Sequence, residues 1–420
     1  MSHIEERFRK LCVMGLGYIG LPTASLLASK GFQVHGVDVN AHVVDTINQG
    51  RIHIRQPELD ILVKSAVQRG RLNAGTSPLT ADVFIIAVPT PFKGNYEPDL
   101  AYVESATRAI APCLVPGNLV ILESTSPVGT TELIAQWLSE ERPDLNLRGA
   151  NGNGAQPDIH IAHCPERVLP GQIIRELVDN DRIVGGIDEN STEVAADFYR
   201  QFVAGQVLTT NARTAEMAKL TENTFRDVNI ALANELSLIS EKLSIDVWEL
   251  IQLANHHPRV NILNPGPGVG GHCIAVDPWF IVHTAPQQAK LIRAAREVNT
   301  DKPEHVIEKV KVRAARIQSP TIACFGLAYK PDIDDLRESP ALYIAKQLSE
   351  AGIGRILAVE PHIDTLPKSF AESTVDLCDQ ETALAQADII LGLVGHRQFK
   401  KLSPQVLQEK IVIDSCGVWR

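Results

Sequence analysis

The sequence predicts an α/β protein with two Rossmann-like, doubly wound domains that are joined by a helical central domain with a long spine helix. Short apolar runs alternate with helical patterns at both ends of the chain, as parallel sheets covered by helices require. A long stretch without Gly or Pro separates these two regions. The 420 residues, 44% of them hydrophobic, are enough for two or three domains. We expect domains at 1–209, 210–302 and 303–420.

Buried parallel strands are predicted in the first domain wherever a short, continuous apolar run occurs. These runs are KLCVMGLG, FQVHGVDV, ADVFIIAV and NLVILES, and IHIAHCPERV follows as a further strand. The intervening stretches LPTASLLASK and LAYVESATRAIAPCL have the pattern of helices. The Gly/Asn-rich segment RGANGNGAQP indicates a surface loop.

The central domain is predicted to be mostly helical. TAEMAKLTENTFRDVNIALANELSLISEKL indicates one long helix, DVWELIQLAN a second, and QQAKLIRAAREVN a third. After Pro303 the alternation resumes, with strand candidates PTIACFGLA, RILAVEPH, ADIILGLVG and KIVIDS and a helix at ESPALYIAKQLSEAG. The two α/β halves share an architecture but no obvious sequence repeat.

Composition excludes several classes of protein. The net charge of −10 argues against binding to nucleic acid or to an anionic membrane surface. The charged start of the chain has no signal-peptide pattern, and no apolar run is long enough to cross a bilayer. Seven cysteines without a CxxC pair predict neither a disulfide framework nor a structural zinc site. We therefore expect a cytoplasmic protein.

A dinucleotide-binding turn is predicted near the N-terminus. In VMGLGYIG, Gly15, Gly17 and Gly20 have the G-x-G-x-x-G spacing between an apolar strand and a helix. Asp38 follows the next strand, 18 residues after Gly20, where an acid binds the ribose hydroxyls. Because this acid would repel a 2′-phosphate, NAD is favoured over NADP. The alternative is a tight glycine turn in a protein that binds no nucleotide.

The loop GPGVGGHCIAVDPWF, residues 266–280, places Cys273 among four glycines and two prolines, with Asp277 four residues later. A thiolate can add to an aldehyde, and loss of a hydride from the adduct gives a thioester that water cleaves to a carboxylate. Cys164 is the second candidate for such a thiol. A metal site built from His272, Cys273, His256 and His257 has poor ligand spacing, so no metal is expected.

A polar stripe on the predicted long helix precedes this loop. Lys219, Asn223 and Arg226 fall at i, i+4 and i+7, and therefore on one helical face. Such a stripe is often only a solvated surface. With a reactive thiol, Lys219 could instead act as a base or hold an oxyanion, and Asn223 could donate to the same oxygen.

Several motifs that follow one another along the chain resemble those of the nucleotide-sugar 6-dehydrogenases, the superfamily that includes UDP-glucose dehydrogenase. They are GLGYIGLP, AVPTP, ESTSPVGTT, CPERVLPG, AEMAKLTENTFRDVNIALANE, HHPRVNILNPGPGVGGHCIAVDPWF and CFGLAYKP-x₅-RESP. The GGHCIAVDP loop is similar to the branch that acts on UDP-N-acetylhexosamines. The resemblance implies NAD-dependent, four-electron oxidation of the C6 alcohol to a uronic acid for bacterial surface polysaccharide. The expected sugar is N-acetyl-D-mannosamine, with the glucosamine and galactosamine isomers as alternatives.

The resemblance also implies a set of site residues. Cys273 is the nucleophile, Lys219 the general acid/base, Asn223 and Asp277 belong to the catalytic shell, Glu166 is associated with thioester hydrolysis, and Thr125 lies near the sugar. The NAD-binding positions are Gly15, Gly17, Tyr18, Ile19, Gly20, Asp38, Thr90, Thr131, Lys330 and Arg337. The UDP-sugar positions are Arg167, Val168, Lys219, Asn223, Arg226, His257, Arg259, Gly270 and Tyr329. For His257 and Arg259 the alternative is a cap on the preceding helix.

Two positions depart from the superfamily's pattern. Pro170 stands where some relatives carry a second glutamate, so hydrolysis would depend on Glu166, Lys219, Asp277 and a water. Asp414 is followed by Ser415, Cys416 and Gly417 where relatives often carry a basic residue, although Arg420 could replace that contact.

Two other functions use the same fold. One is a dehydrogenase that stops after one hydride, as 3-hydroxyacid or phosphogluconate dehydrogenases do, and the other is a nucleotide-sugar-binding regulator without catalysis. We also expect a homodimer in which the long helix pairs with its copy and Arg259 reaches the neighbouring site.

Overall fold

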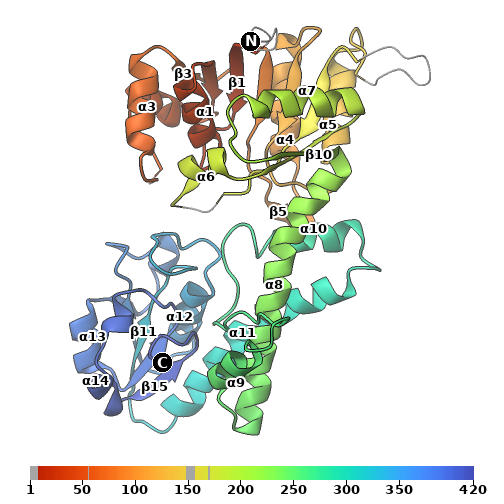
Figure 1. Ribbon diagram of the computed structural model, residues 1–420. Coiled ribbons are helices and arrows are strands. Elements are labelled where there is room, and N and C mark those ends of the chain that lie inside the picture. The colour runs from red at the N-terminus through yellow and green to blue at the C-terminus, as the bar shows by residue number, and fades with distance from the viewer. Residues whose placement is uncertain (1–7, 55, 148–156, 169–170) are drawn as a thin grey trace. The chain divides into compact units, whose positions relative to one another are not determined.

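The computed structural model describes residues 8–54, 56–147, 157–168 and 171–420 (Figure 1). The chain divides into two compact units, Met1–Thr221 and Glu222–Arg420, and each unit is described by itself. The predicted surface loop at 148–157 lies almost wholly outside the described residues. The fold is mixed α/β with parallel sheets, as predicted.

The first unit contains an eight-stranded sheet in the order β10-β9-β8-β7-β4-β1-β2-β3. Its strands are β1 (Lys10–Met14), β2 (Gln33–Val37), β3 (Leu72–Gly75), β4 (Val83–Ile86), β7 (Leu119–Leu122), β8 (His160–His163), β9 (Arg182–Gly186) and β10 (Val207–Asn211). Neighbouring strands are parallel except for the antiparallel pair β8–β9. The run β3-β2-β1-β4-β7-β8 is the Rossmann order. A small hairpin, β5 (Phe92–Lys93) with β6 (Glu97–Pro98), follows β4.

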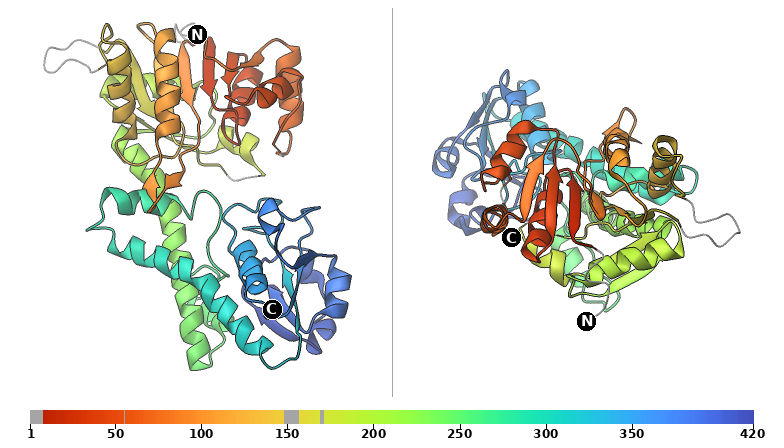
Figure 2. Two further views of the ribbon diagram at one scale, coloured as in Figure 1. Left: turned by 180° about the vertical axis from the view of Figure 1, so that it is seen from behind. Right: turned by 90° about the horizontal axis from the view of Figure 1, so that it is seen from above.

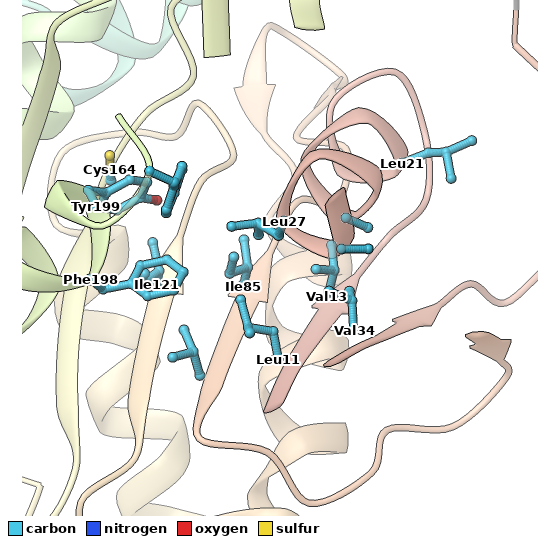
Figure 3. Packing of buried hydrophobic residues seen from close by; sticks show 14 of the residues in the cluster. Leu11, Val13, Leu21, Leu27, Val34, Ile85, Ile121, Cys164, Phe198 and Tyr199 are labelled. Atoms are coloured by element: carbon cyan, nitrogen blue, oxygen red, sulfur yellow. The ribbon is translucent and has the colours of Figure 1, made fainter. Parts of the chain in front are cut away.

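Helices cover both faces of this sheet, as the views in Figures 1 and 2 show. They are α1 (Gly20–Ser29), α2 (Ala41–Asn48), α3 (Leu59–Gln68), α4 (Ala101–Ile110), α5 (Thr130–Glu141), α6 (Ile173–Asp179) and α7 (Glu189–Arg200). One core lies between the sheet and α1, α2, α3 and α7. A second core lies between the sheet and α4 and α5. Figure 3 shows the first core, with Leu27 of α1 and Phe198 of α7 over Val13, Ile85 and Ile121 of the strands.

The predicted long helix is α8 (Ala212–Leu243), which extends over 32 residues without interruption. The division between the two units falls within this helix, between Thr221 and Glu222. Lys219 therefore belongs to the first unit, and Asn223 and Arg226 belong to the second.

The second unit contains a five-stranded parallel sheet in the order β13-β12-β11-β14-β15. Its strands are β11 (Thr321–Phe325), β12 (Arg355–Val359), β13 (Val375–Leu377), β14 (Ile389–Gly392) and β15 (Ile411–Asp414). Its further helices are α9 (Val247–Ala254), α10 (Asp277–Thr284), α11 (Lys290–Ala314), α12 (Pro340–Glu350), α13 (Gln380–Gln386) and α14 (Pro404–Gln408). Helices α11 and α12 cover one face of the sheet, where Val310 and Ile344 pack on the strands.

Helix α11 differs from the sequence prediction, which ended the helical stretch before Pro303. The helix continues through Pro303 to Ala314. A proline inside a helix leaves the carbonyl four residues earlier, here that of Asn299, without its N–H partner. Pro303 is buried, and so are Val306, Ile307 and Val310 in the turns that follow. Burial of this apolar face stabilises the continued helix and offsets the lost hydrogen bond.

The two sheets share a local backbone feature at the carboxyl end of their first strands. Gly15 has φ 91° and its amide donates to Val37 O at 2.8 Å. Gly326 has φ 93° and its amide donates to Val359 O at 2.9 Å. The sequences around them, GLGY and GLAY, differ by one residue.

The acid after the second strand repeats as well. Asp38 accepts from the Leu16 amide at 3.1 Å, and Glu360 accepts from the Leu327 amide at 2.8 Å and the Ala328 amide at 3.0 Å. In each sheet a carboxylate thus ties the first glycine turn to the end of the second strand. The structure reveals a local repeat that the sequence patterns alone did not make obvious.

No helix within the described residues is both long enough and apolar enough to cross a membrane.

Candidate active site

The predicted dinucleotide turn has the geometry of a cradle. A Cβ atom on Gly15 would lie 2.7 Å from Ala87 O, and one on Gly20 would lie 1.8 Å from Gly15 O. A Cβ on Gly17 would meet nothing within 4 Å. The outer two glycines are therefore required by the backbone itself, whereas Gly17 borders open space. This arrangement fits a pyrophosphate, which needs close approach of the backbone at the start of α1.

The other predicted NAD positions of this region surround that turn. Tyr18 is 43% exposed and Ile19 is half-buried. Asp38 is half-buried and accepts from the amides of Leu16 and Asn40, at 3.1 and 2.9 Å. A carboxylate has about four acceptor sites, so these two bonds leave acceptor capacity for ribose hydroxyls.

Thr90 and Thr125 occupy neighbouring loops at the carboxyl ends of β4 and β7. The Thr90 hydroxyl donates to Thr125 O at 2.5 Å, which joins the two loops. Thr131 lies deeper, at the start of α5, where its side chain is fully buried and its hydroxyl donates to Glu216 at 2.6 Å. Glu216 also accepts from the amides of Thr131 and Gly129, at 2.7 and 2.6 Å. Thr131 therefore helps to hold α8 against α5 within the first unit.

The segment after β8 carries Glu166, Arg167 and Val168, all half-buried. Glu166 accepts from the Val168 amide, and Arg167 Nη1 donates to Asp181 O at 3.0 Å. The Val168 side chain packs against the apolar cluster of α1 and α6. The loop is thus fixed at its backbone while its two charged side chains keep exposed surface.

A buried ion pair lies beneath this loop. Glu123, directly after β7, and Arg182, at the start of β9, are 1% and 2% exposed, with Oε1 and Nη1 3.8 Å apart. Burial raises the pKa of Glu123 to about 7, although Arg182 opposes that shift. Thr23 donates to the other carboxylate oxygen at 3.2 Å. Glu166 is close enough to raise the pKa of Glu123 further.

Lys219 is buried in the first unit, on α8, with 8% of its surface exposed. It lies near His163, a fully buried residue at the end of β8. Burial lowers the pKa of His163 to about 3, and the Lys219 charge acts in the same direction. The imidazole is therefore neutral at physiological pH.

The predicted nucleophile lies in the second unit, on the loop before α10. Cys273 Sγ is 3.1 Å from Nδ1 of His272, and the Cys273 carbonyl accepts from the amides of Val276 and Asp277 at 2.9 Å. Burial and the nearby Arg337 lower the pKa of His272. A neutral imidazole beside the thiol can accept its proton. Cys164, the second candidate thiol, is fully buried, and burial raises its pKa to about 12.

Asn223 and Asp277 form a direct pair. The Asn223 amide nitrogen donates to Asp277 Oδ2 at 2.5 Å, and Asp277 is 3% exposed at the first turn of α10. The carboxylate of Asp277 is thereby held in one orientation. The structure brings these two predicted residues together from segments that are 54 positions apart.

The loop after β11 packs on the glycine loop that carries Cys273. A Cβ on Gly270 would lie 2.4 Å from Glu338 O, and one on Gly271, which has φ 83°, would lie 2.9 Å from the Tyr329 ring. These two glycines are needed for the close approach of the two loops. The predicted substrate position Gly270 thus has a packing role in the described structure.

Charged side chains of the β11 loop lie close to the thiol. Burial lowers the pKa of Lys330, as does Arg226, whereas Asp335 and Cys273 act in the opposite direction. Arg337 is held by Asp335 through contacts of 2.5 to 3.1 Å. A cation near a cysteine favours the thiolate.

Three further predicted substrate positions are exposed. His257 and Arg259 follow α9, and Arg226 lies on α8. The Arg259 amide donates to His257 Nδ1 at 3.3 Å, and the His257 amide donates to Ala254 O at 3.1 Å. The backbone of His257 thus closes the end of α9, while the Arg259 side chain stays exposed to solvent.

The segment after β15 is organised by Asp414. Its carboxylate accepts from the amides of Cys416, Val418 and Trp419 at 3.0 to 3.2 Å. Arg420 pairs with Asp246, the N-cap of α9.

One group of candidate metal ligands occurs within the described residues, away from the predicted positions. Asp332, His362 and His396 bring their ligand atoms within 4.8 Å of one another. Both His396 nitrogens already have partners, because Nδ1 accepts from the Asp332 amide at 2.9 Å and Nε2 faces Glu360 at 3.1 Å. These contacts account for the cluster without a metal ion, because they hold the loop after β11, which carries Asp332, to His396.

Comparison with known proteins shows that the chain belongs to the UDP-glucose/GDP-mannose dehydrogenase family. Residues 9–203 match its NAD binding domain, 213–301 its central domain and 323–420 its UDP binding domain. The chain therefore combines an NAD-binding Rossmann domain, a helical central domain and a UDP-binding domain, and NAD is its cofactor.

Curated relatives and solved structures agree with this assignment. The chain is 58% identical over 99% of its length to an NDP-N-acetyl-D-galactosaminuronic acid dehydrogenase of Ralstonia nicotianae, 97% of which is covered. It is 57% identical over 98% of its length to the UDP-N-acetyl-D-mannosamine dehydrogenase of Escherichia coli (strain K12), all of which is covered. A UDP-D-ManNAc dehydrogenase structure from Pyrococcus horikoshii superposes with a TM-score of 0.86 at 40% identity, covering 98% of this chain and 96% of that one.

Several residues at the site escaped the sequence reasoning. Glu123 and Glu216 lie within the quoted motifs ESTSPVGTT and AEMAKLTENTFRDVNIALANE, and Asp335 lies in the unspecified x₅ before RESP, but none of the three was assigned a role. Only the structure shows what their carboxylates hold. His272 was considered only as a metal ligand, although its position next to Cys273 was visible in the sequence. Adjacent side chains in an extended segment usually point apart, so adjacency alone did not indicate the 3.1 Å contact.

Proposed function

We propose that this protein oxidises the C6 primary alcohol of a UDP-N-acetylhexosamine to a carboxylate, with reduction of two NAD⁺. The balanced reaction consumes one water and releases three protons. The contact between the Cys273 thiol and His272, beside the part-buried Asn223–Asp277 pair, carries the proposal, because it provides a nucleophile that can hold an aldehyde for a second oxidation.

Each chemical role falls to a residue of suitable type. Lys219 serves as the base for the alcohol proton in the first oxidation, and NAD, when bound, accepts the hydride. The Cys273 thiol passes its proton to His272, and Lys330 stabilises the resulting thiolate. The thiolate adds to the aldehyde carbon, and the second oxidation converts the adduct into a thioester.

Hydrolysis of the thioester requires a base for water. Asp277 is held by Asn223 in a fixed orientation, and Glu166 is the other carboxylate that we assign to this step. Water attack releases the carboxylate product and returns Cys273 to the thiol. Asn223 also donates to oxyanions formed at the reacting carbon, which is the role of a hydrogen-bond donor in such a site.

Binding roles follow from charge and family. We assign Gly15, Gly17, Gly20 and Asp38 to NAD on the geometry of the turn, and Tyr18, Ile19, Thr90 and Thr131 to the same cofactor by resemblance. Lys330 and Arg337 are assigned to closure over the cofactor. The positions assigned to the UDP-sugar are Arg167, Val168, Lys219, Asn223, Arg226, His257, Arg259, Gly270 and Tyr329.

The N-acetylated manno sugar is the proposed substrate, and the galacto sugar is the second candidate. Relatives at nearly equal identity bear the two names, 57% for the mannosamine enzyme and 58% for the galactosaminuronic acid enzyme. We place the reaction in the cytoplasm, in synthesis of bacterial surface polysaccharide. We further propose a homodimer in which α8 pairs with its copy and Arg259 reaches the neighbouring site.

The test is an assay of NADH formed per sugar oxidised against UDP-N-acetyl-mannosamine, -glucosamine and -galactosamine. We expect two NADH per sugar with one preferred isomer, and a uronic acid as the product. Cys273→Ala should form no acid, whereas Cys378→Ala, a thiol with no assigned role, should behave as the wild type. One NADH per sugar with free aldehyde as the final product would refute the proposal. Light scattering at assay concentration tests the dimer.

A further inference from the structure

A pocket of about 260 Å³ lies within the second unit, apart from the residues assigned to catalysis. Its walls come from α8, α9 and α11 and from the segment that follows β15. Ile245, Trp248, Pro265 and Val306 give it an apolar side. Small-molecule sites have this mixture of apolar wall and a few polar groups, although most are somewhat larger.

Most charged groups in this pocket are already paired. Glu241 of α8 faces His305 at 3.1 Å and Lys309 at 3.0 Å, both on α11. Asp246 before α9 pairs with Arg420. Asp414, the third acid, lies at the end of β15 and accepts only from backbone amides of the turn that follows it. These groups therefore compensate one another or their local backbone.

Lys302 is the exception among the pocket residues. It is 6% exposed, and its ammonium donates to the hydroxyl of Ser237. No carboxylate of a described residue lies within ion-pair distance of it. Burial lowers the pKa of Lys302 to about 8, while Glu241 opposes that shift. A buried cation with a neutral partner is unfavourable unless another group completes its environment.

A second polar group in the same pocket is also incomplete. Ser240 lines the pocket, is 2% exposed, and its hydroxyl has no hydrogen-bond partner among the residues that the structure describes. Buried hydroxyls without partners are uncommon. Among the described residues, the wall of one pocket thus holds a buried cation without an acidic partner, Lys302, and a buried hydroxyl without a hydrogen-bond partner, Ser240.

We propose that this pocket binds a small organic monoanion, a carboxylate on an apolar body, through Lys302 and Ser240. The anionic oxygens accept from the Lys302 ammonium and the Ser240 hydroxyl, and the apolar body contacts Trp248 and Val306. A single charge is the proper complement, because Lys302 is the one cation of the described pocket without an acidic partner. A dianionic phosphate would leave a buried negative charge uncompensated.

The probe is 4-fluorobenzoate, whose binding to the full-length protein is followed by ¹⁹F NMR line broadening and by calorimetry. The matched neutral compound is 4-fluorobenzamide, and inorganic phosphate is the competitor. We expect benzoate to bind at least tenfold more tightly than the benzamide. Lys302→Met, which keeps the side chain's length without its charge, should weaken benzoate binding at least tenfold, and Ser240→Ala several-fold. Lys346→Met, at a half-buried residue of α12 outside the pocket, is the control and should bind as the wild type.

Equal affinity for the benzoate and the benzamide would overturn the proposal, because the pocket would then recognise only an apolar ring. Displacement of benzoate by phosphate at lower concentration would overturn the choice of a monoanion. If Lys302→Met fails to fold, Ser240→Ala decides, and unchanged benzoate affinity in that variant refutes the site. Trp248→Phe localises the site independently, because fluorescence quenching by benzoate should disappear in that variant.

Discussion

Substitution by alanine should affect the stability of the fold differently at two glycines of the nucleotide turn. A methyl group on Gly17 meets no protein atom within 4 Å, and its backbone lies outside the left-handed region. Gly17→Ala should therefore leave the free energy of unfolding within about 0.5 kcal/mol of wild type, because nothing in the fold has to move. A methyl group on Gly20 would lie 1.8 Å from Gly15 O, a backbone atom that cannot rotate away.

Gly20→Ala should consequently destabilise the protein. Forcing extra volume into a packed site costs about 1–3 kcal/mol, and a clash with main chain belongs at the upper end of that range. NAD binding should fall in both variants for different reasons. In Gly17→Ala the methyl group occupies the space over the turn, and we expect at least a tenfold loss of affinity, or about 1.4 kcal/mol.

The assays are urea unfolding for stability and calorimetric titration with NAD⁺ for affinity, so neither depends on turnover. The second sheet offers an internal comparison, because Ala328 stands at the position equivalent to Gly17 in its GLAY turn. Wild-type NAD affinity in a stable Gly17→Ala protein would refute the placement of the pyrophosphate over this turn. Wild-type stability of Gly20→Ala would show that the turn can relax in a way that the structure does not indicate.

Three further predictions concern buried charges. Arg296 donates to the fully buried Asp227 at 2.7 Å, so Arg296→Met leaves that carboxylate without its charged partner. The free energy of unfolding in urea titrations should fall by about 3–5 kcal/mol, and a loss below about 1 kcal/mol would contradict this prediction. Burial raises the pKa of Glu123 from 4.5 to about 7, so the folded state favours the neutral carboxyl. The contribution of this group to the free energy of unfolding is therefore complete below pH 4.5 and is lost as the pH rises through 7. Glu123→Gln should remove up to about 3 kcal/mol of that pH dependence, seen as a smaller difference between unfolding curves at pH 5 and pH 8 than in the wild type. Asn223→Asp sets a second carboxylate against Asp277 in place of a hydrogen-bond donor. Turnover should drop at pH 8 and recover in part at pH 6, where the two carboxylates share a proton. An equal loss of turnover at pH 6 and pH 8 would show that the lost hydrogen bond to Asp277 is not the cause.

The sequence by itself determined the class of fold and the identity of the chemical groups. Strands buried on both faces are continuous apolar runs, and β1, β2, β4 and β7 were found for that reason. Glycines with special backbone requirements mark the nucleotide turn and the Cys273 loop, and these local signals need no knowledge of distant residues. Strands β3 and β10 were missed because their residues are partly exposed or polar, and β9 was missed because an arginine and two glycines leave it only two apolar residues.

Only the tertiary structure decided which groups meet. Glu216 holds the start of α5 from 85 positions away, Asp227 meets Arg296 from 69 positions away, and neither pair follows a local pattern. The sequence prediction ended the central domain at Lys302, because Pro303 follows it. Helix α11 instead continues through Pro303, and the ammonium of Lys302 is buried. The physical reason is common to these cases. Strand order and helix packing fix contacts between distant segments, and the free energy of burying a charge depends on those contacts rather than on the neighbours in sequence.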